Sequence, residues 1–118
     1  MDIWGKVQEI LGEAITLPPA PIASYVPWRI AQNFLVISGQ LPMKGGKLLA
    51  EGKIPLEVSE EEGKLCAQWC AVNLLGHLQE ALKQSGKELE QLVRITGYIA
   101  CTPEYSRMHV ILNGASDF

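Results

Sequence analysis

The sequence predicts a single α+β domain, and two observations lead to that class. A helical pattern of about 26 residues at 59–85 lies between two segments, 25–38 and 92–101, that are rich in β-branched and aromatic residues. The chain has 118 residues, 47% of them apolar and 19% charged, so it is long enough to bury one core. Layering the helix on the strands covers the apolar surface of both, which is how an α+β domain is built.

The first elements are a short helix and a linker. Asp2 can cap a helix over residues 2–11, whose apolar side chains fall on one face, so we expect an N-terminal helix within residues 1–14. The stretch TLPPAP has three prolines in six residues, which favours an extended linker over residues 15–22. The α+β core would then occupy residues 23–118.

A hairpin and a glycine-rich loop follow. Residues 25–30 and 34–38 predict two strands joined by the short link AQN, which makes an antiparallel hairpin. The loop MKGGKLLAEGK comes next, with a short strand expected at 47–50.

The long helix has the clearest signals. Ser59 and Glu62 have the spacing of a capping box, in which each side chain accepts a hydrogen bond from the backbone amide of the other residue. Apolar residues then recur at helical spacing, and a glycine after Ser85 ends the pattern. The face expected to pack on the sheet comprises Ala67, Leu74, Leu78 and Leu82.

The last elements are a strand and a second helix. LVRITGYIAC, at 92–101, predicts a strand, and Thr102 is expected to cap a helix that begins at Pro103. The chain ends at Phe118, where a layered α+β domain normally returns to its sheet. We therefore expect the C-terminal part of the core to be missing from this chain.

Charge and cysteine content narrow the function classes. A net charge of −3 with no basic block argues against nucleic acid as a partner. No apolar run approaches the ~20 residues of a membrane helix, and the N-terminus lacks the layout of a secretion signal. Three cysteines without a CxxC pair fit a reducing compartment. We expect a cytoplasmic protein with no membrane partner.

Two clusters on the long helix need an interpretation. Cys66, Cys70, Asn73 and His77 lie within about 60° of arc, but structural zinc needs four converging ligands and this helix supplies three at best. We interpret them as a buried flank, and expect no metal. On the opposite face, Leu65, Trp69, Val72 and Gly76 form a second apolar stripe. It could contact another chain or, as we favour, the N-terminal helix.

Three ordered blocks resemble the YjgF/RidA family, also called endoribonuclease L-PSP. They are PPAPIASYVPWRIAQNFLVISGQLP, EEGKLCAQWCAVNLLGHL and VRITGYIACTPEYSRMHVILNGASDF, and the resemblance spans about residues 15–118. It is closest to a branch with an added N-terminal helix and the NGASD signature. It implies a chorismate-mutase-like two-layer sandwich, a mixed β-sheet with two main helices on one face. It also implies homotrimers with ligand sites in the clefts between subunits, and no metal or organic cofactor.

The resemblance further implies site residues. It places Tyr25, Ser38 and Asn113 in the cleft, where Gly39 would permit close approach of the backbone. Each polar or aromatic residue has a plainer alternative: Ser38 as a strand-end hydroxyl, Tyr25 as a core aromatic, and Asn113 as a residue that ends its helix. The Arg that grips the substrate carboxylate and the Glu that orients water in family deaminases would follow NGASD. No residue of this chain matches them, so the catalytic residues are not assigned.

Three functions follow from these observations, and whether the chain is an enzyme stays open. The first is hydrolysis of reactive enamines and imines to keto acids and ammonia, impaired by the absent Arg. The second is non-catalytic binding of a small carboxylate or carbonyl compound on the same trimeric scaffold. The third is RNA cleavage, which the acidic balance and the lack of a histidine or carboxylate pair disfavour.

Overall fold

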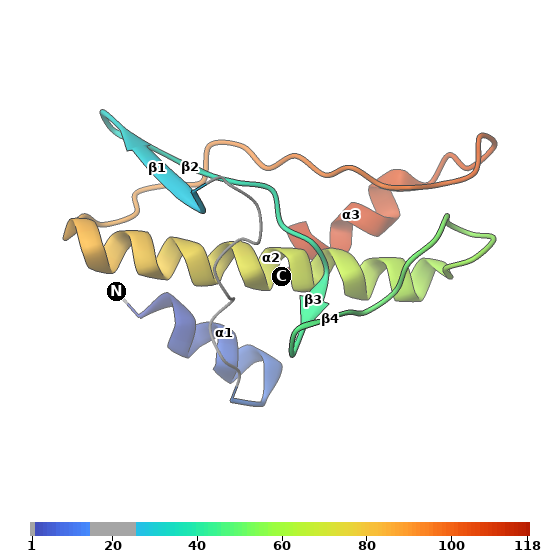
Figure 1. Ribbon diagram of the computed structural model, residues 1–118, viewed down its shortest axis with the longest axis horizontal. Coiled ribbons are helices and arrows are strands. Elements are labelled where there is room, and N and C mark those ends of the chain that lie inside the picture. The colour runs from blue at the N-terminus through green and yellow to red at the C-terminus, as the bar shows by residue number, and fades with distance from the viewer. Residues whose placement is uncertain (1, 15–25) are drawn as a thin grey trace. The chain divides into compact units, whose positions relative to one another are not determined.

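The computed structural model describes residues 2–14 and 26–118, and over that part of the chain it is an α+β structure of three helices and two small antiparallel sheets (Figure 1). It divides into two compact units. The first comprises Met1–Gln40 with Val72–Gln91, and the second Leu41–Ala71 with Leu92–Phe118. The long helix α2, Glu60–Ser85, contributes its N-terminal half to the second unit and its C-terminal half to the first.

The first unit begins with helix α1, Ile3–Leu11, which confirms the predicted N-terminal helix. The Asp2 carboxylate accepts a hydrogen bond from the Gly5 amide at 2.9 Å, so this residue caps the helix as expected. Gly12 ends it in the left-handed conformation at φ +74°, which a glycine adopts without strain. The linker predicted at 15–22 lies outside the described residues.

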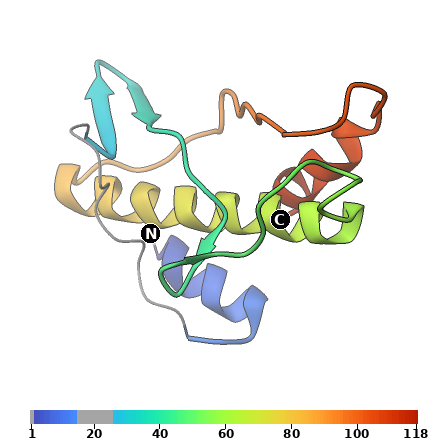
Figure 2. The same ribbon diagram turned by 45° about the vertical axis from the view of Figure 1, so that its right-hand side comes forward.

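Helix α1 is attached to the C-terminal half of α2 (Figures 1 and 2). The Gln79 side-chain oxygen accepts hydrogen bonds from the Ile3 and Trp4 amides, at 2.6 and 3.0 Å. These are N–H groups that a helix N-terminus cannot bond internally. Gln79 lies seven residues after Val72, on the face of α2 that carries the second apolar stripe. Helix α1 therefore contacts α2 through Gln79, and the favoured contact with the stripe residues themselves stays a prediction.

The predicted hairpin is confirmed by strands β1, Trp28–Ala31, and β2, Phe34–Ile37. They pair antiparallel with Trp28 opposite Ile37 and Ala31 opposite Phe34. Side chains alternate between a half-buried face and an exposed one, as the two-residue period of a strand requires. β1 begins at Trp28, later than the predicted residue 25. Pro27, which precedes it, has no backbone N–H to donate to a strand ladder.

The second unit contains a smaller hairpin, β3, Met43–Lys44, and β4, Lys47–Leu48. Gly45 and Gly46 connect the strands, with φ values of +61° and +80°, the positive values that a two-residue hairpin turn favours. The Lys44 ammonium lies 4.9 Å from the centre of the Trp69 ring, a cation–π contact that covers part of the stripe on α2.

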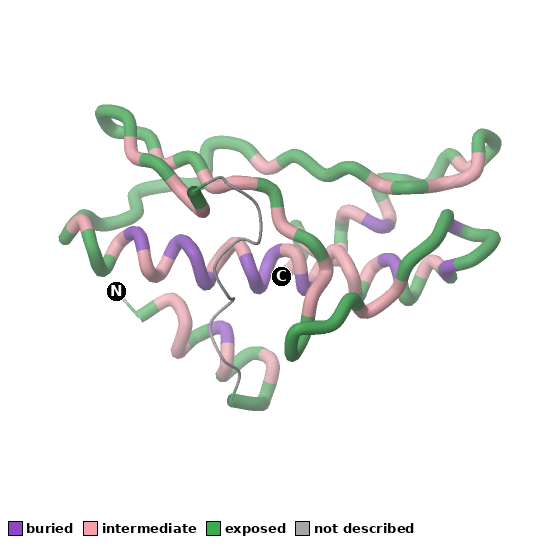
Figure 3. The backbone as a smooth tube through the Cα atoms, viewed as in Figure 1, coloured by how far each residue is buried: buried purple, intermediate pink, exposed green. Residues whose placement is uncertain are grey.

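The core of the second unit is formed by Ile54, Val58 and Ile111, which are 2–5% exposed. Ile111 comes from helix α3, Met108–Ser116, which lies against the N-terminal half of α2 (Figures 1 and 2). Most of the buried residues in Figure 3 lie along α2.

The capping box that begins α2 is present. The Glu62 amide donates to the Ser59 hydroxyl at 3.1 Å, and the Ser59 amide donates to the Glu62 carboxylate at 3.2 Å. The apolar face expected to pack on a sheet is only partly covered, because Leu78 is buried while its other members are half-buried.

Two expectations about the C-terminal elements are wrong. Residues 92–101 run extended but form no strand; only Ile54 and Cys101 make an isolated parallel bridge. A strand needs a neighbour, and in the described chain no other segment pairs with these residues. The second helix begins at Met108 rather than at Pro103. The preceding residues form a turn instead, closed by the hydrogen bond from the Tyr105 amide to the Thr102 carbonyl at 3.1 Å.

Candidate functional site

Ser38 lies directly after β2, and the hairpin fixes its orientation. Its amide donates to the Pro27 carbonyl at 2.9 Å, and its hydroxyl donates to the Val26 carbonyl at 2.6 Å. The plainer alternative for Ser38 is therefore correct to this extent: the hydroxyl bonds backbone, although across the hairpin rather than within its own turn. Because the single hydroxyl proton is used in that bond, the oxygen lone pairs remain to accept a hydrogen bond from a ligand or a water.

The backbone after Ser38 is open. Gly39 is exposed, and no atom lies within 4 Å of the position that a Cβ would occupy there. The amides of Gly39 and Gln40 make no hydrogen bond in the described part of the chain. The Gln40 side-chain amide donates to the Ser38 carbonyl at 3.0 Å, which holds the turn. Adjacent unpaired amides beside a hydroxyl acceptor can bind an anionic oxygen and a water together.

The other predicted site residues are placed separately. Asn113 lies on α3 and is exposed. It belongs to the second unit, whereas Ser38 and Gly39 belong to the first. Tyr25 lies outside the described residues. The structure thus brings Ser38 and Gly39 together, and a cleft shared with Tyr25 and Asn113 stays a prediction.

Gly114, the residue after Asn113, has a structural role that the sequence did not reveal. A Cβ on Gly114 would overlap the Lys64 carbonyl oxygen and lie 2.8 Å from the Lys64 carbonyl carbon. The α3 backbone therefore touches the α2 backbone at this point, which only glycine permits. The NGASD motif was a visible signal, but a helix crossing depends on residues 50 positions apart and cannot be read from it.

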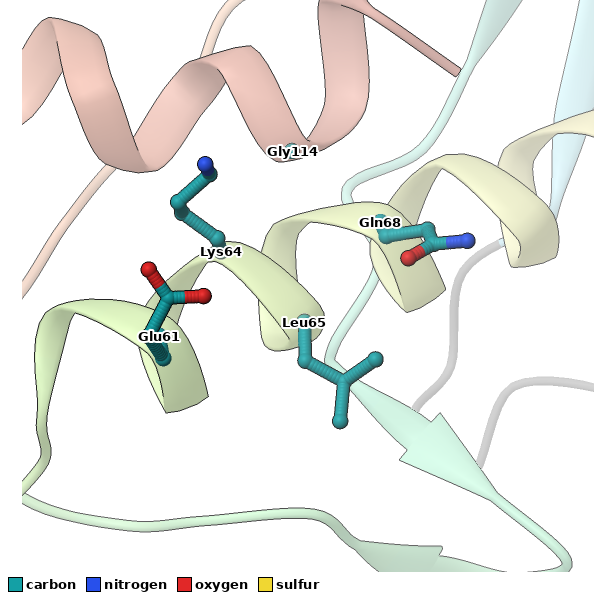
Figure 4. A pocket seen from close by; sticks show the side chains of 5 residues that line it. All are labelled: Glu61, Lys64, Leu65, Gln68 and Gly114. Atoms are coloured by element: carbon teal, nitrogen blue, oxygen red, sulfur yellow. The ribbon is translucent and has the colours of Figure 1, made fainter.

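Beside this crossing is an open pocket of about 360 Å³ that sequence reasoning also missed (Figure 4). Gly114 forms part of its wall. The other lining residues all come from one side of α2 and follow the i, i+3, i+4, i+7 spacing of a helix face: Glu61, Lys64, Leu65 and Gln68.

A second polar group lies at the N-terminus of α2. One Glu60 carboxylate oxygen accepts hydrogen bonds from the Tyr105 hydroxyl at 2.6 Å and from the Arg107 guanidinium at 2.8 Å. These bonds, from Tyr105 and then from Arg107, hold the pKa of Glu60 below its ordinary value. Burial, together with the bond to Glu60, raises the pKa of Tyr105 to about 12. Both shifts oppose proton transfer near neutral pH, so we assign this group to anchoring the turn before α3.

The predicted buried flank of α2 is confirmed for Asn73 and His77, whereas Cys66 and Cys70 are only half-buried. Burial, and then the charge of Glu62, raises the pKa of Cys66, and burial raises that of Cys70 to about 11. Such thiols are poor nucleophiles at neutral pH. His77 is buried, and burial lowers its pKa. Within residues 2–14 and 26–118, no three His, Cys, Asp or Glu side chains are arranged to hold a metal ion.

Membrane insertion has no candidate helix in the described ranges: none combines the length and the apolarity that a span requires.

Known proteins similar to this chain share one family. Residues 15–117 match the family Endoribonuclease L-PSP. Protein TCP17 of Trypanosoma cruzi is 26% identical over 107 residues, which is 91% of this chain and 66% of TCP17. This chain thus spans just under two thirds of the length of that relative.

Two crystal structures share the fold. Protein Atu1372 of Agrobacterium tumefaciens, whose function is unknown, is 36% identical with a TM-score of 0.77, covering 98% of this chain and 69% of its own. A candidate endoribonuclease of Shewanella oneidensis MR-1 is 24% identical with a TM-score of 0.85, covering 97% and 75%. These likenesses confirm the predicted α+β, chorismate-mutase-like fold, and the match over 15–117 confirms the resemblance. This chain belongs to the Endoribonuclease L-PSP family, the YjgF/RidA family.

Proposed function

We propose that this protein acts on small metabolites that carry a carboxylate beside a reactive imine or enamine, in the cytoplasm, and hydrolyses them to keto acids and ammonia. The observation that carries the proposal is the open end of β2. There, the amides of Gly39 and Gln40 make no hydrogen bond within the described residues, and they lie next to the Ser38 hydroxyl oxygen, whose proton is already donated to the Val26 carbonyl. Membership of the YjgF/RidA family supports the reaction class.

Each group has a task that its chemistry allows. The Gly39 and Gln40 amides would bind the substrate carboxylate, because backbone N–H groups stabilise an anionic oxygen without a charged side chain. The Ser38 oxygen would accept a hydrogen bond from water and so direct it at the imine carbon. An enamine first tautomerises to the imine, as a proton moves from its nitrogen to its β-carbon. Water then adds across the C=N bond, and the resulting carbinolamine loses ammonia to leave the keto acid. Tyr25 and Asn113 would complete the cleft.

A second function, binding without catalysis, is favoured by one specific observation. Ser38 bonds only backbone and the Gln40 side chain bonds only the Ser38 carbonyl, so in the described part of the chain no carboxylate or imidazole is hydrogen-bonded to the groups at this turn. General acid–base catalysis requires such a group, or a water chain in its place. Without it, the same amides would bind a keto acid and release it unchanged.

The experiment is a coupled assay of keto-acid formation from 2-aminoacrylate generated in situ. We expect the protein to accelerate hydrolysis over buffer, and Ser38→Ala to lower that acceleration by about tenfold, because it removes one hydrogen bond to the attacking water. Ser106→Ala is the matched control, since Ser106 is exposed and has no hydrogen-bonding partner in the described structure.

Acceleration that Ser38→Ala leaves undiminished would contradict the placement of the site. Keto-acid binding by calorimetry that depends on Ser38, without any acceleration, would establish the non-catalytic function instead. Neither measurement tests RNA cleavage, which the net charge of −3 does not favour.

We also propose a homotrimer with the site between subunits. The exposed face of the β1–β2 hairpin supports it. Phe34 and Val36 on that face of β2 are 58% and 64% exposed, so two large apolar side chains are left for another subunit to cover. Light scattering that finds a monomer at tens of micromolar protein would remove this part of the proposal.

A further inference from the structure

The pocket beside the α2–α3 crossing has the size of a site for one small metabolite. Its volume of about 360 Å³ is near the lower end of the ~300–1,000 Å³ range of ligand pockets. It lies entirely in the second unit, and none of the residues assigned to the proposed function lines it.

Two opposite charges line this pocket, and no salt bridge joins them in the described part of the chain. Glu61 and Lys64 are three residues apart on α2, so their Cβ atoms are neighbours at about 5–6 Å. Neither side chain forms an ion pair or a hydrogen bond within the described residues. Figure 4 shows Lys64 extending toward α3, with Glu61 and Gln68 on either side of it.

The remaining lining residues complement these charges. Gln68 lies one turn after Lys64 and adds two side-chain N–H donors. Leu65 is 46% exposed and offers an apolar contact at the pocket. Gly114 presents backbone in place of a side chain, which leaves room for a ligand at the crossing.

We propose that this pocket binds a zwitterionic α-amino acid with a small apolar side chain. Lys64 and Gln68 bind the α-carboxylate, Glu61 binds the α-ammonium, and Leu65 contacts the side chain. A ligand carrying only one of the two charges leaves either Glu61 or Lys64 unsatisfied, so the pocket distinguishes an amino acid from the keto acid of the same carbon skeleton. The inference goes beyond the proposed function, because it assigns a second ligand class to a separate site.

The test is calorimetric titration with three ligands of one skeleton: L-valine, 2-ketoisovalerate, which lacks the ammonium, and isobutylamine, which lacks the carboxylate. We expect L-valine to bind at least about tenfold more tightly than either of the others, the difference that one charge-assisted contact makes. Lys64→Gln and Glu61→Gln should each weaken L-valine binding by a similar factor, and Glu61→Gln should leave 2-ketoisovalerate binding unchanged.

Matched controls are Lys53→Gln and Glu104→Gln. Both residues are exposed, belong to the same unit, and have side chains without a partner in the described structure. They remove the same charges and should leave L-valine binding unchanged. All four substituted side chains lie at the surface or the pocket rim, so thermal unfolding should show every variant folded.

Three results would overturn the proposal: no binding of L-valine by the wild-type protein at millimolar concentration, equal binding of 2-ketoisovalerate, or equal affinity in the pocket variants and the controls. These outcomes are separate from the enamine assay, which depends on Ser38.

Discussion

Gly114→Ala should destabilise the protein strongly, because the added methyl group has no space at the helix crossing. The new Cβ would overlap the Lys64 carbonyl oxygen and lie 2.8 and 2.9 Å from the carbonyl carbon and Cα of Lys64. All three are backbone atoms, so no side-chain rotation relieves the overlap and the two helices must separate. Separation also loosens Ile111, which is 2% exposed in the core of the second unit.

The expected magnitude follows from two opposing effects. Overpacking costs about 1–3 kcal/mol, and a backbone overlap belongs at the upper end of that range. Replacing glycine by alanine inside a helix returns about 1 kcal/mol of helix propensity. The difference is about 2 kcal/mol of unfolding free energy, roughly a thirtyfold change in the folding equilibrium. For a chain of this length it corresponds to a Tm lowered by about 8 °C.

Urea unfolding followed by circular dichroism measures this change, with two alanine substitutions for comparison. At Gly39 a methyl group meets no atom within 4 Å, so Gly39→Ala should change the unfolding free energy by less than ~0.5 kcal/mol. At Gly63 it meets side-chain methyl groups of Ile54 and Ile111, which can rotate, so Gly63→Ala should fall between the other two. If Gly114→Ala unfolds at the same urea concentration as Gly39→Ala, α3 does not cross α2 at Gly114.

Three further predictions concern α2 and the turn before α3. Ser59→Ala removes half of the capping box and should cost about 1 kcal/mol of unfolding free energy, measured by urea unfolding. Burial lowers the pKa of His77, so as pH falls below ~6.5 the unfolded chain takes up the proton first and stability declines. Comparing Tm from pH 8 to pH 5 for wild type and His77→Gln should show a smaller decline in the variant. Glu60→Gln should lower the pKa of Tyr105 from about 12 toward its ordinary ~10, measured by ultraviolet titration against Tyr105→Phe; an unchanged pKa would contradict the Glu60 bond.

The elements that the sequence predicted correctly are those specified by neighbouring residues. The capping box at Ser59 and Glu62 acts over three positions, and the Asp2 cap of α1 acts over a similar span. The β1–β2 hairpin likewise needs only two short strands and the turn at Gln32, whose φ is +55°. Such signals lie within one turn or one hairpin, so the sequence alone contains them.

The elements that it missed depend on contacts between distant residues. Thr102 and Pro103 suit the start of a helix and the start of a turn equally well. What decides for the turn is Glu60, more than forty residues earlier, which binds Tyr105 and Arg107 and fixes the chain before α3. The strand predicted at 92–101 has the right composition, but a composition does not provide the neighbouring strand.

The candidate site divides in the same way, and its two glycines show why. Both Gly39 and Gly114 stand in motifs that resemble the family, but the sequence indicated close approach of a backbone only for Gly39. In the structure Gly39 has empty space where a side chain would be, which exposes amides that a ligand can reach, whereas Gly114 is filled by the backbone of Lys64. The glycine of NGASD therefore permits two helices to pack closely, and Asn113, Ser116 and Asp117 are the exposed residues of that motif. Gly39→Ala should thus weaken ligand binding while leaving the unfolding free energy unchanged. Gly114→Ala should lower the unfolding free energy first. Comparing the loss of affinity with the loss of stability in each variant therefore distinguishes a glycine that gives a ligand access from one that permits helix packing.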